Sequence, residues 1–395
     1  MRRRHPWWLL FLGLGLVLGV GALTRAAYAA PRESPPKGAL VSPGVEPGVG
    51  NDYCLGCHAK PDQIKTLPNG ESLYLTIDPQ LYADSVHGAS GYACVQCHID
   101  IRTYPHPEQK AEDRRDVTVI MSGICKRCHI GNYEKTLDSM HEQARERGDK
   151  NAAVCADCHN PHTQQRLTNP DTQALLPRAR AQIPQTCARC HSAIYDQYKQ
   201  SVHGAALLEL SNPDVPTCIT CHGVHNIGDP TTAAFRLDSP QLCAGCHTDT
   251  AMMSKYNVST QVLNTYLADF HGTTITLFQK ESPEQVTNKP VCFDCHGIHN
   301  IAKPNDPQKG LSVKENLLVT CQKCHPDATA NFPDAWLSHY EPSPAQNSLV
   351  YYVNLFYKFF IPGVLGGMGV FVLSDIWRRF IQPALKRVKK GARPA

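Results

Sequence analysis

The sequence has no cysteine outside one repeated motif, and its basic residues exceed its acidic residues only at the two ends. The 395 residues carry a formal net charge of +4, but segments 1–29 and 351–395 alone carry +4 and +7, so residues 30–350 carry −7. An acidic central part argues against nucleic acid as a partner and allows a basic protein partner. Since no cysteine lies elsewhere, one motif accounts for all the thiol chemistry of the chain.

That motif is Cys-x-x-Cys-His, and it occurs nine times, numbered here 1 to 9 along the chain. Its cysteine pairs are Cys54 and Cys57, Cys94 and Cys97, Cys125 and Cys128, Cys155 and Cys158, Cys187 and Cys190, Cys218 and Cys221, Cys243 and Cys246, Cys292 and Cys295, and Cys321 and Cys324. The histidines that close the copies are His58, His98, His129, His159, His191, His222, His247, His296 and His325.

Three kinds of site use paired cysteines. Structural zinc sites usually take two such pairs, and a single pair can form a short disulfide or a redox-active dithiol. None of these requires a histidine after the second cysteine in nine copies of nine. Covalent attachment of c-type haem does, because both thiols become thioethers on the porphyrin and the histidine ligates the iron. The sequence therefore predicts nine c-type haems with their iron.

The other histidines match this number. Of 19 histidines, nine close the motifs and His5 lies in the N-terminal segment. Nine haems with histidine on both faces of the iron need nine further ligands. The sequence predicts that these distal ligands are His87, His106, His141, His162, His203, His225, His271, His299 and His339.

These histidines also reveal an internal repeat of two motifs. The histidines outside the motifs occur in two sequence contexts. The first type, as in Ser-Val-His-Gly at 85–88 and 201–204, stands before an even-numbered motif. The second type follows an even-numbered motif, as in His-Gly-Val-His at 222–225. The predicted modules are 51–120, 121–182, 183–238 and 239–316, with a half-module at 317–345. The first type has five members when His339 is included, as many as the odd-numbered haems, and is predicted to ligate them. The second type has four members when His106 is included, and is predicted to ligate the four even-numbered haems of neighbouring modules.

The spacing of the motifs constrains the fold. About 320 residues between the two ends leave about 36 for each haem, which is too few for independent protein cores. The 30 prolines and 27 glycines indicate many turns. We expect a mostly α-helical chain with extensive loop and almost no sheet, in which the haems themselves form the core of the repeated two-haem modules.

The N-terminus has the pattern of a secretory signal peptide, residues 1–29. Basic residues at 2–4 precede an apolar run from Trp7 to Leu23, and Ala27-Tyr28-Ala29 offers a cleavage site. An uncleaved membrane anchor is the alternative. Residues 30–50 are rich in proline and glycine and are predicted to be a linker. Either reading places the nonahaem domain, residues 51–345, outside the cytoplasm.

A second apolar run predicts a C-terminal transmembrane helix at 349–377. The tail 378–395 is basic and is expected on the cytoplasmic side. Gly363 and Gly367 form a Gly-x-x-x-Gly pattern that favours close packing against another membrane helix. A quinone-linked integral membrane protein is the candidate partner. The run contains no histidine, so it has no ligand pair for a haem b.

The doubled motifs, with Ser-Val-His-Gly upstream and His-Gly-x-His-Asn-Ile at their end, resemble multihaem cytochromes c of the cytochrome c3-like and c554-like class. The resemblance covers about Asn51 to Tyr340 and implies close-packed haem pairs in an electron-conducting chain. It departs from quinol-oxidising tetrahaem proteins, whose anchor is N-terminal, and looks more like the cytochrome c subunit of a complex with a cytochrome b-type partner.

Two functions are compatible with these features. The favoured one is a membrane-anchored relay of electrons between a quinone-linked membrane partner and a soluble, periplasmic or extracellular acceptor, with no catalytic residues. The alternative is a reductase or oxidase of small nitrogen or sulfur compounds, which needs one haem accessible to substrate. Every motif ends in histidine and the count of distal ligands leaves no open position, so the relay fits better.

The first prediction concerns the number of haems. If every motif is used, pyridine haemochrome analysis of the purified full-length chain will give nine covalent haems per polypeptide. Eight or fewer would show that at least one Cys-x-x-Cys-His copy carries no haem.

Overall fold

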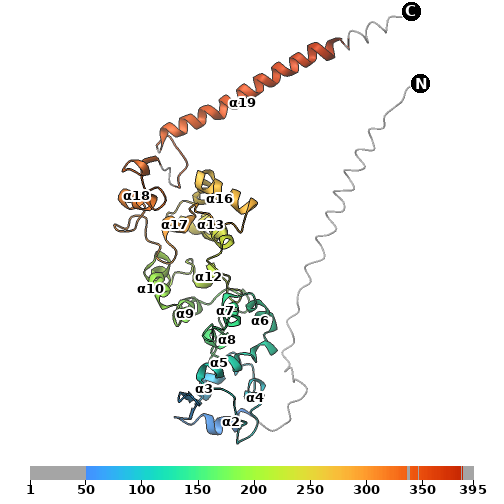
Figure 1. Cartoon of the computed structure of the whole chain (residues 1–395), viewed down its shortest axis with the longest axis vertical. Coiled ribbons are helices and arrows are strands. Elements are labelled where there is room, and N and C mark those ends of the chain that lie inside the picture. Colours follow the sequence, from blue (N-terminus) through green and yellow to red (C-terminus); the bar gives the residue numbers. More distant parts are fainter. Residues whose placement is uncertain (1–49, 336–338, 346, 384, 386–395) are drawn as a thin grey trace, which may run out of the picture. The chain divides into compact units, whose positions relative to one another are not determined.

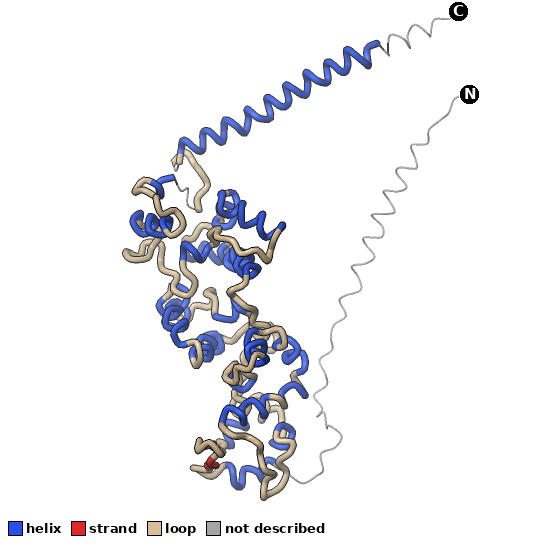
Figure 2. Tube along the Cα trace, viewed as in Figure 1, coloured by secondary structure: helices blue, strands red, loops and turns tan. Residues whose placement is uncertain are grey.

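The computed structural model describes residues 50–335, 339–345, 347–383 and 385. These residues are mostly helical, with long loops and few strands (Figure 2), so the predicted fold class is confirmed at this level. The predicted signal segment 1–29, its cleavage site, nearly all of the linker 30–50 and most of the basic tail after 385 lie outside the described residues.

Short helices recur along the described chain, and Figure 1 labels the principal ones. Those that contain all or part of a motif are α2 (Asn51–His58), α4 (Cys94–Cys97), η1 (Cys125–Arg127), α8 (Cys155–Cys158), α9 (Pro177–Ala188), α12 (Cys218–His222), α13 (Ala233–His247), α17 (Cys292–His296) and α18 (Lys314–Gln322). The others before the C-terminal helix are α3 (Pro79–Ala83), α5 (Arg114–Ser122), α6 (Ile130–Thr136), α7 (Met140–Glu146), α10 (Ser192–Gln200), α11 (Val202–Leu208), α14 (Thr250–Met253), η2 (Ser254–Tyr256), α15 (Val262–Ala268), α16 (Phe270–Glu281) and η3 (Phe332–Ala335).

Regular sheet is confined, among the described residues, to one antiparallel pair. Strands β1 (Ile64–Thr66) and β2 (Ser72–Tyr74) pair with Lys65 opposite Leu73. Gly70 lies between them with a φ of +88°, a conformation that side chains other than hydrogen disfavour. The near absence of sheet agrees with the sequence-based expectation.

Odd and even motifs occupy opposite ends of their helices. Odd motifs lie at or just after the end of a helix, as in α2, α9, α13 and α18, whereas the first cysteine of each even motif begins a helix. A helix start leaves backbone N–H groups without partners. In each even motif the residue before the second cysteine accepts from the N–H just before the helix: Gln96, Asp157, Thr220 and Asp294.

The segments of the Ser-x-His type are helix or turn starts. The Ser139 and Ser201 hydroxyls accept from the backbone N–H three residues later, at 3.2 and 3.0 Å. Ser85 accepts from Gly88 at 3.0 Å, and in the fourth copy Asp269 accepts from His271 at 2.7 Å. Serine and aspartate are favoured at such caps because their oxygens satisfy these N–H groups. The cap places His141, His203 and His271 within the first turn of a helix, and His87 lies in a turn.

In three of the modules, a tyrosine and a glycine set how closely the segment of the Ser-x-His type approaches the helix before it. A Cβ atom on the glycine after the histidine would lie 1.8–2.1 Å from the carbonyl oxygen of a tyrosine six residues earlier. The same tyrosine donates its hydroxyl to the carbonyl two residues before the even motif, at 2.7–2.9 Å. The pairs are Tyr82 with Gly88, Tyr198 with Gly204, and Tyr266 with Gly272.

The second module has neither this tyrosine nor this glycine. Thr136 and Glu142 stand at the positions that the tyrosine and the glycine occupy in the other three modules. Helix α6 ends at Thr136, and Glu142 lies in the first turn of α7. Burial raises the pKa of Tyr82 to about 12, so the first of the three hydroxyls keeps its proton for donation at neutral pH.

Protein side chains form only a small core. Fourteen apolar side chains are buried in the described part of the chain. The one compact cluster joins Leu237, Ile275 and Val291, with Phe278 and Phe293 packed against it. Helices with so little mutual burial gain little stability from apolar contacts among protein side chains alone.

The C-terminal helix α19 (Ser348–Ile376) continues into a π-helical turn, η4 (Trp377–Ile381). The combined helix Ser348–Ile381 has 34 residues, and its length and apolar composition are sufficient to cross a membrane. At 1.5 Å per residue, about 20 residues would span the ~30 Å hydrocarbon layer. The predicted helix at 349–377 is thus found. The glycines at 363, 366, 367 and 369 have no atom within 4 Å of an added Cβ.

The second prediction follows from the tyrosine–glycine approach. Gly204→Ala should lower the free energy of unfolding by about 1–3 kcal/mol, because the new methyl group overlaps the Tyr198 carbonyl oxygen. Guanidinium unfolding followed by far-ultraviolet circular dichroism measures the change. Gly131→Ala is the control, since it lies in helix α6 with open space around its Cβ position. Equal losses in the two variants would show that the close approach does not matter.

Candidate cofactor sites

Each motif histidine faces one other histidine in the described structure. The ring centroids of the nine pairs are 5.9–6.4 Å apart, and every one of the 18 histidines predicted as iron ligands is used once. In motif order the pairs are His58–His106, His98–His162, His129–His87, His159–His225, His191–His141, His222–His299, His247–His203, His296–His339 and His325–His271.

The separation fits two imidazoles on opposite sides of one metal ion. A metal–imidazole bond is about 2 Å long and the nitrogen lies about 1 Å from its ring centre, so the two centroids come to about 6 Å apart. Ordinary aromatic pairs also occur at 4.5–7 Å, in stacked or edge-on geometry. Here the interplanar angles vary from 10° to 60°, whereas the distance hardly changes. A constant distance with free rotation is what ligation along a common axis requires.

The hydrogen bonds of the rings support ligation through Nε2. Nδ1 of His58 lies 2.9 Å from the Leu75 carbonyl oxygen, and Nδ1 of His87 lies 3.1 Å from that of Pro161. Acceptors also lie beside Nδ1 of His106, His159, His271 and His339. An Nδ1–H donated to an acceptor leaves the Nε2 lone pair free, as in most metal-binding histidines.

Burial keeps several of these rings neutral. It lowers the pKa of His203 and of His296 to about 4, with smaller contributions from His247 and His339, respectively. Their folded-state pKa values therefore lie below the usual value of 6.5, and both rings are unprotonated at neutral pH. The neutral ring is the form that can donate a lone pair to a metal.

The pairs connect neighbouring modules. For odd motifs from 3 onwards, the second histidine comes from the module upstream, as when His87, located between motifs 1 and 2, faces His129 of motif 3. For even motifs it comes from downstream, as when His162, after motif 4, faces His98 of motif 2. In seven of the nine pairs, a histidine of the first type faces an odd-numbered motif or one of the second type faces an even-numbered motif, as expected from the sequence.

His106 and His339 depart from that expectation. His106 faces His58 of motif 1, and His339 faces His296 of motif 8, so the two odd/even assignments were wrong. Both exceptions involve the ends of the series. Motif 1 has no upstream module to supply its partner, and the histidine after motif 2 takes that place. No tenth motif follows motif 9, so the last histidine serves motif 8.

Three backbone hydrogen bonds reinforce the exchange between modules. Val86, Met140 and Val202, each just before a histidine of the Ser-x-His type, donate across the module boundary at 2.8–2.9 Å. The acceptors are the carbonyls of Gln164, Ile227 and Ile301, each two residues after the other type of histidine. Each bond thus holds two of the predicted distal ligands at once.

The cysteines place the motifs side by side in chain order. A hydrogen bond joins the first cysteines of the two motifs within a module: Cys54 with Cys94, Cys125 with Cys155, Cys187 with Cys218, and Cys243 with Cys292. Each even motif also lies close enough to the next odd one for their cysteines to interact electrostatically: Cys97 with Cys128, Cys158 with Cys187, Cys221 with Cys243, and Cys295 with Cys321. No cysteine is in a disulfide.

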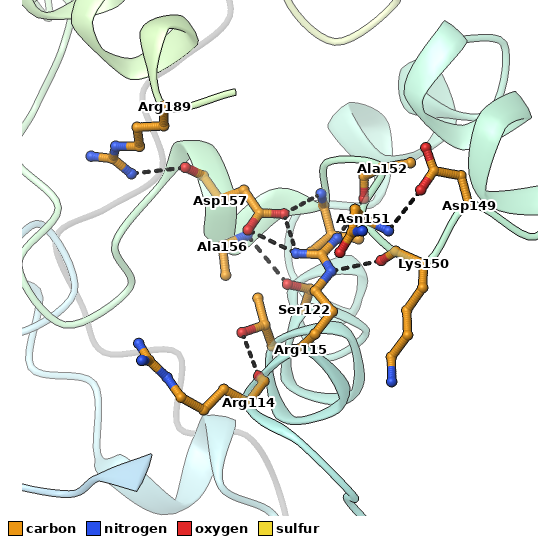
Figure 3. Close-up of polar contacts among 12 residues, drawn as sticks. Arg114, Arg115, Ser122, Asp149, Lys150, Asn151, Ala152, Ala156, Asp157 and Arg189 are labelled. Carbon is orange, nitrogen blue, oxygen red and sulfur yellow. Dashed lines mark hydrogen bonds and ion pairs between the residues drawn. The ribbon is translucent and has the colours of Figure 1, made fainter. Parts of the chain in front are cut away.

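An arginine fixes the two motifs of the second module to each other (Figure 3). Arg115, on α5 before motif 3, donates from Nη1 to both carboxylate oxygens of Asp157 in motif 4, at 2.7 and 2.9 Å. Its other donors reach the carbonyls of Lys150 and Ala152. Asp157 also caps its own helix, so one carboxylate both starts the motif helix and anchors it.

The other modules also join their two motifs through a polar residue before the odd motif, and only the fourth repeats the arginine–aspartate pair. In the fourth module Arg236, on α13, donates to both oxygens of Asp294 at 2.7 and 3.1 Å. In the third, Arg180 donates to the Val215 carbonyl. In the first, the Asn51 side chain accepts from the Cys94 N–H at 2.8 Å. Nε of Arg180 and of Arg236 is buried without a hydrogen-bond partner among the described atoms, so the sites can accommodate a further acceptor group.

Several of these residues were missed by the reasoning from sequence. The clamps Arg115, Arg180 and Arg236, and the tyrosines at 82, 198 and 266, lie outside the motifs. One signal was available: the residue before the second cysteine is a hydrogen-bond acceptor in all even motifs, and in the odd motifs it is glycine, lysine or arginine. That alternation marks helix starts and helix ends.

The described residues contain no group of three or more His, Cys, Asp or Glu side chains that could hold a bare metal ion. Comparison with known proteins gave no match to a family model, to a curated protein or to a solved structure. The candidate sites therefore rest on the nine histidine pairs and their cysteines.

The third prediction tests the arginine clamp. Arg115→Ala removes four hydrogen bonds from a half-buried ion pair and should cost about 1–3 kcal/mol in the free energy of unfolding. The midpoint of guanidinium unfolding should fall without a change in slope. Lys199→Ala, which removes an exposed ion pair with Asp196, is the control and should leave the midpoint unchanged. If the midpoints of both variants coincide with that of the unaltered chain, the clamp contributes nothing.

Proposed function

We propose that this chain is a membrane-anchored, extracytoplasmic nonahaem c-type cytochrome that relays electrons. The observation that carries the proposal is the pairing of every motif histidine with one other histidine at about the separation that an iron between them requires. A haem bound in this way accepts and passes on one electron and offers no coordination position to a substrate.

The residues of the chain would hold each haem through four side chains. Two cysteines of a motif would form thioethers, the motif histidine would ligate one face of the iron, and a histidine from elsewhere would ligate the other. The capped helix starts fix the second histidine, and the Nδ1 acceptors fix the orientation of its ring. The proposal also explains the small protein core, because nine macrocycles would supply the missing apolar surface.

The contacts between cysteines support conduction along the chain. Since the haems would be bound through these sulfur atoms, the closeness of the first cysteines of the two motifs in a module would bring the attachment edges of two haems together. The weaker interactions between modules continue the series from motif 1 to motif 9. Electrons would then pass between neighbouring haems in sequence order.

The helix α19 supports anchoring in the cytoplasmic membrane, with the haem domain exported and the basic tail inside. His339 precedes Ser348 by nine residues, a length that extended chain covers in about 30 Å. The eighth histidine pair is therefore tethered close to the membrane. A quinone-linked integral membrane protein would exchange electrons near this end, and a soluble or surface partner elsewhere on the acidic domain.

The fourth prediction tests both the relay and one cross-module pair. His203→Met should give one haem a methionine ligand and a higher potential than the other haems. When the oxidised variant is mixed with half an electron equivalent per chain, the electron should collect on that haem. Its reduction should follow first-order kinetics that do not depend on protein concentration, because the transfer occurs within one molecule.

A matched background identifies the haem concerned. In a chain with Cys243→Ser and Cys246→Ser, motif 7 binds no haem, so adding His203→Met should produce no methionine-ligated haem. If the methionine signal persists in this background, His203 serves a different iron. If reduction depends on protein concentration, electrons move between molecules and the chain is no relay.

A further inference from the structure

His106 differs from the other eight predicted distal ligands in its exposure. It is the one exposed residue among them, whereas the rest are partly buried. Beside it, Tyr104 is 81% exposed and contacts the His106 ring edge-on at 5.8 Å between centroids. The face of the first histidine pair on the His106 side is therefore open to solvent.

The segment that carries His106 is held by short-range bonds. Within residues 99–111 the structure describes three hydrogen bonds: Ile101 N–H to the His98 carbonyl, Arg102 to Ile99, and His106 Nδ1 with the Thr103 carbonyl. Each spans three residues. The first anchor to a distant part of the chain is the Asn69 N–H, which donates to the Glu112 carbonyl at 3.2 Å. No helix or strand lies between Cys97 and Arg114.

The other distal ligands are fixed across longer distances. Bonds between modules hold the segments of His87 and His162, of His141 and His225, and of His203 and His299. His271 lies in the 12-residue helix α16, and Thr265 and Ser259 contact His339 from more than 70 residues away. Seven of the other eight distal ligands are thus held by bonds between modules and His271 lies in a helix, whereas no described bond between modules holds the loop of His106. That loop can therefore move without breaking such a bond.

We propose that the first pair, His58–His106, is a site where a small external ligand replaces the protein's own distal histidine. This inference rests on the proposed function, because it requires a haem bound at motif 1. The ligand class is small molecules with one donor lone pair, either neutral, such as carbon monoxide, or singly negative, such as cyanide. In the exchange the bond to His106 Nε2 breaks, the ligand's donor atom takes the position, and the ring moves into solvent. No electron is transferred.

Carbon monoxide titration of the reduced full-length protein in detergent tests the proposal. The unaltered chain should bind one molecule per nine haems, at a rate that levels off at high concentration because departure of His106 becomes limiting. In His106→Ala the number bound should stay at one while the rate no longer levels off and rises by about tenfold or more. His106→Met, whose thioether can still ligate iron, is the second variant, and its number bound should also be one.

His225→Ala is the matched control, because His225 is a partly buried ligand held between modules. It should raise the number bound to two. The proposal is overturned if the unaltered chain binds no carbon monoxide, or if His106→Ala raises the number from one to two, since the ligand then binds elsewhere. A pyridine haemochrome count below nine with an empty motif 1 would instead contradict the proposed function.

Discussion

The constraint on which the structure depends is that two histidines, most often from different modules, must meet at about 6 Å. Nine such histidine pairs occur in the described structure. Because odd motifs from motif 3 onwards take their partner from upstream and even motifs from downstream, no module can be completed alone. The module boundaries drawn from the sequence thus describe a repeat of pattern, whereas the ligand pairs tie each repeat to the next.

Local interactions position the paired histidines. A serine or aspartate cap fixes the start of the helix that carries one histidine, and a glycine lets that helix approach the preceding tyrosine. An arginine or asparagine then holds the two motifs of a module together. Each is a weak interaction of the usual size, about 1 kcal/mol. Together they place the histidine rings opposite each other, since apolar packing among the side chains is slight.

Much of this could be predicted because the motifs are long and repeated. Helical character, the scarcity of sheet, the C-terminal helix and all 18 histidines now found in pairs follow from composition, periodicity and counting. Which histidine meets which could be predicted only inside the series, where each module has two neighbours. His106 and His339 were misassigned because the repeat has ends, and a pattern averaged over copies does not describe its ends. Arg115, Arg180 and Tyr198 were missed because their partners are backbone carbonyls or carboxylates far away in sequence, which no local pattern reveals.

An electron paramagnetic resonance spectrum of the fully oxidised, full-length protein, integrated against its haem content, tests the central claim most directly. With imidazole on both faces of every iron, we expect low-spin ferric signals that account for nine irons per chain and no high-spin signal. A high-spin signal equal to one or more irons per chain, in the absence of added ligands, would show that at least one of the nine histidine pairs does not hold an iron.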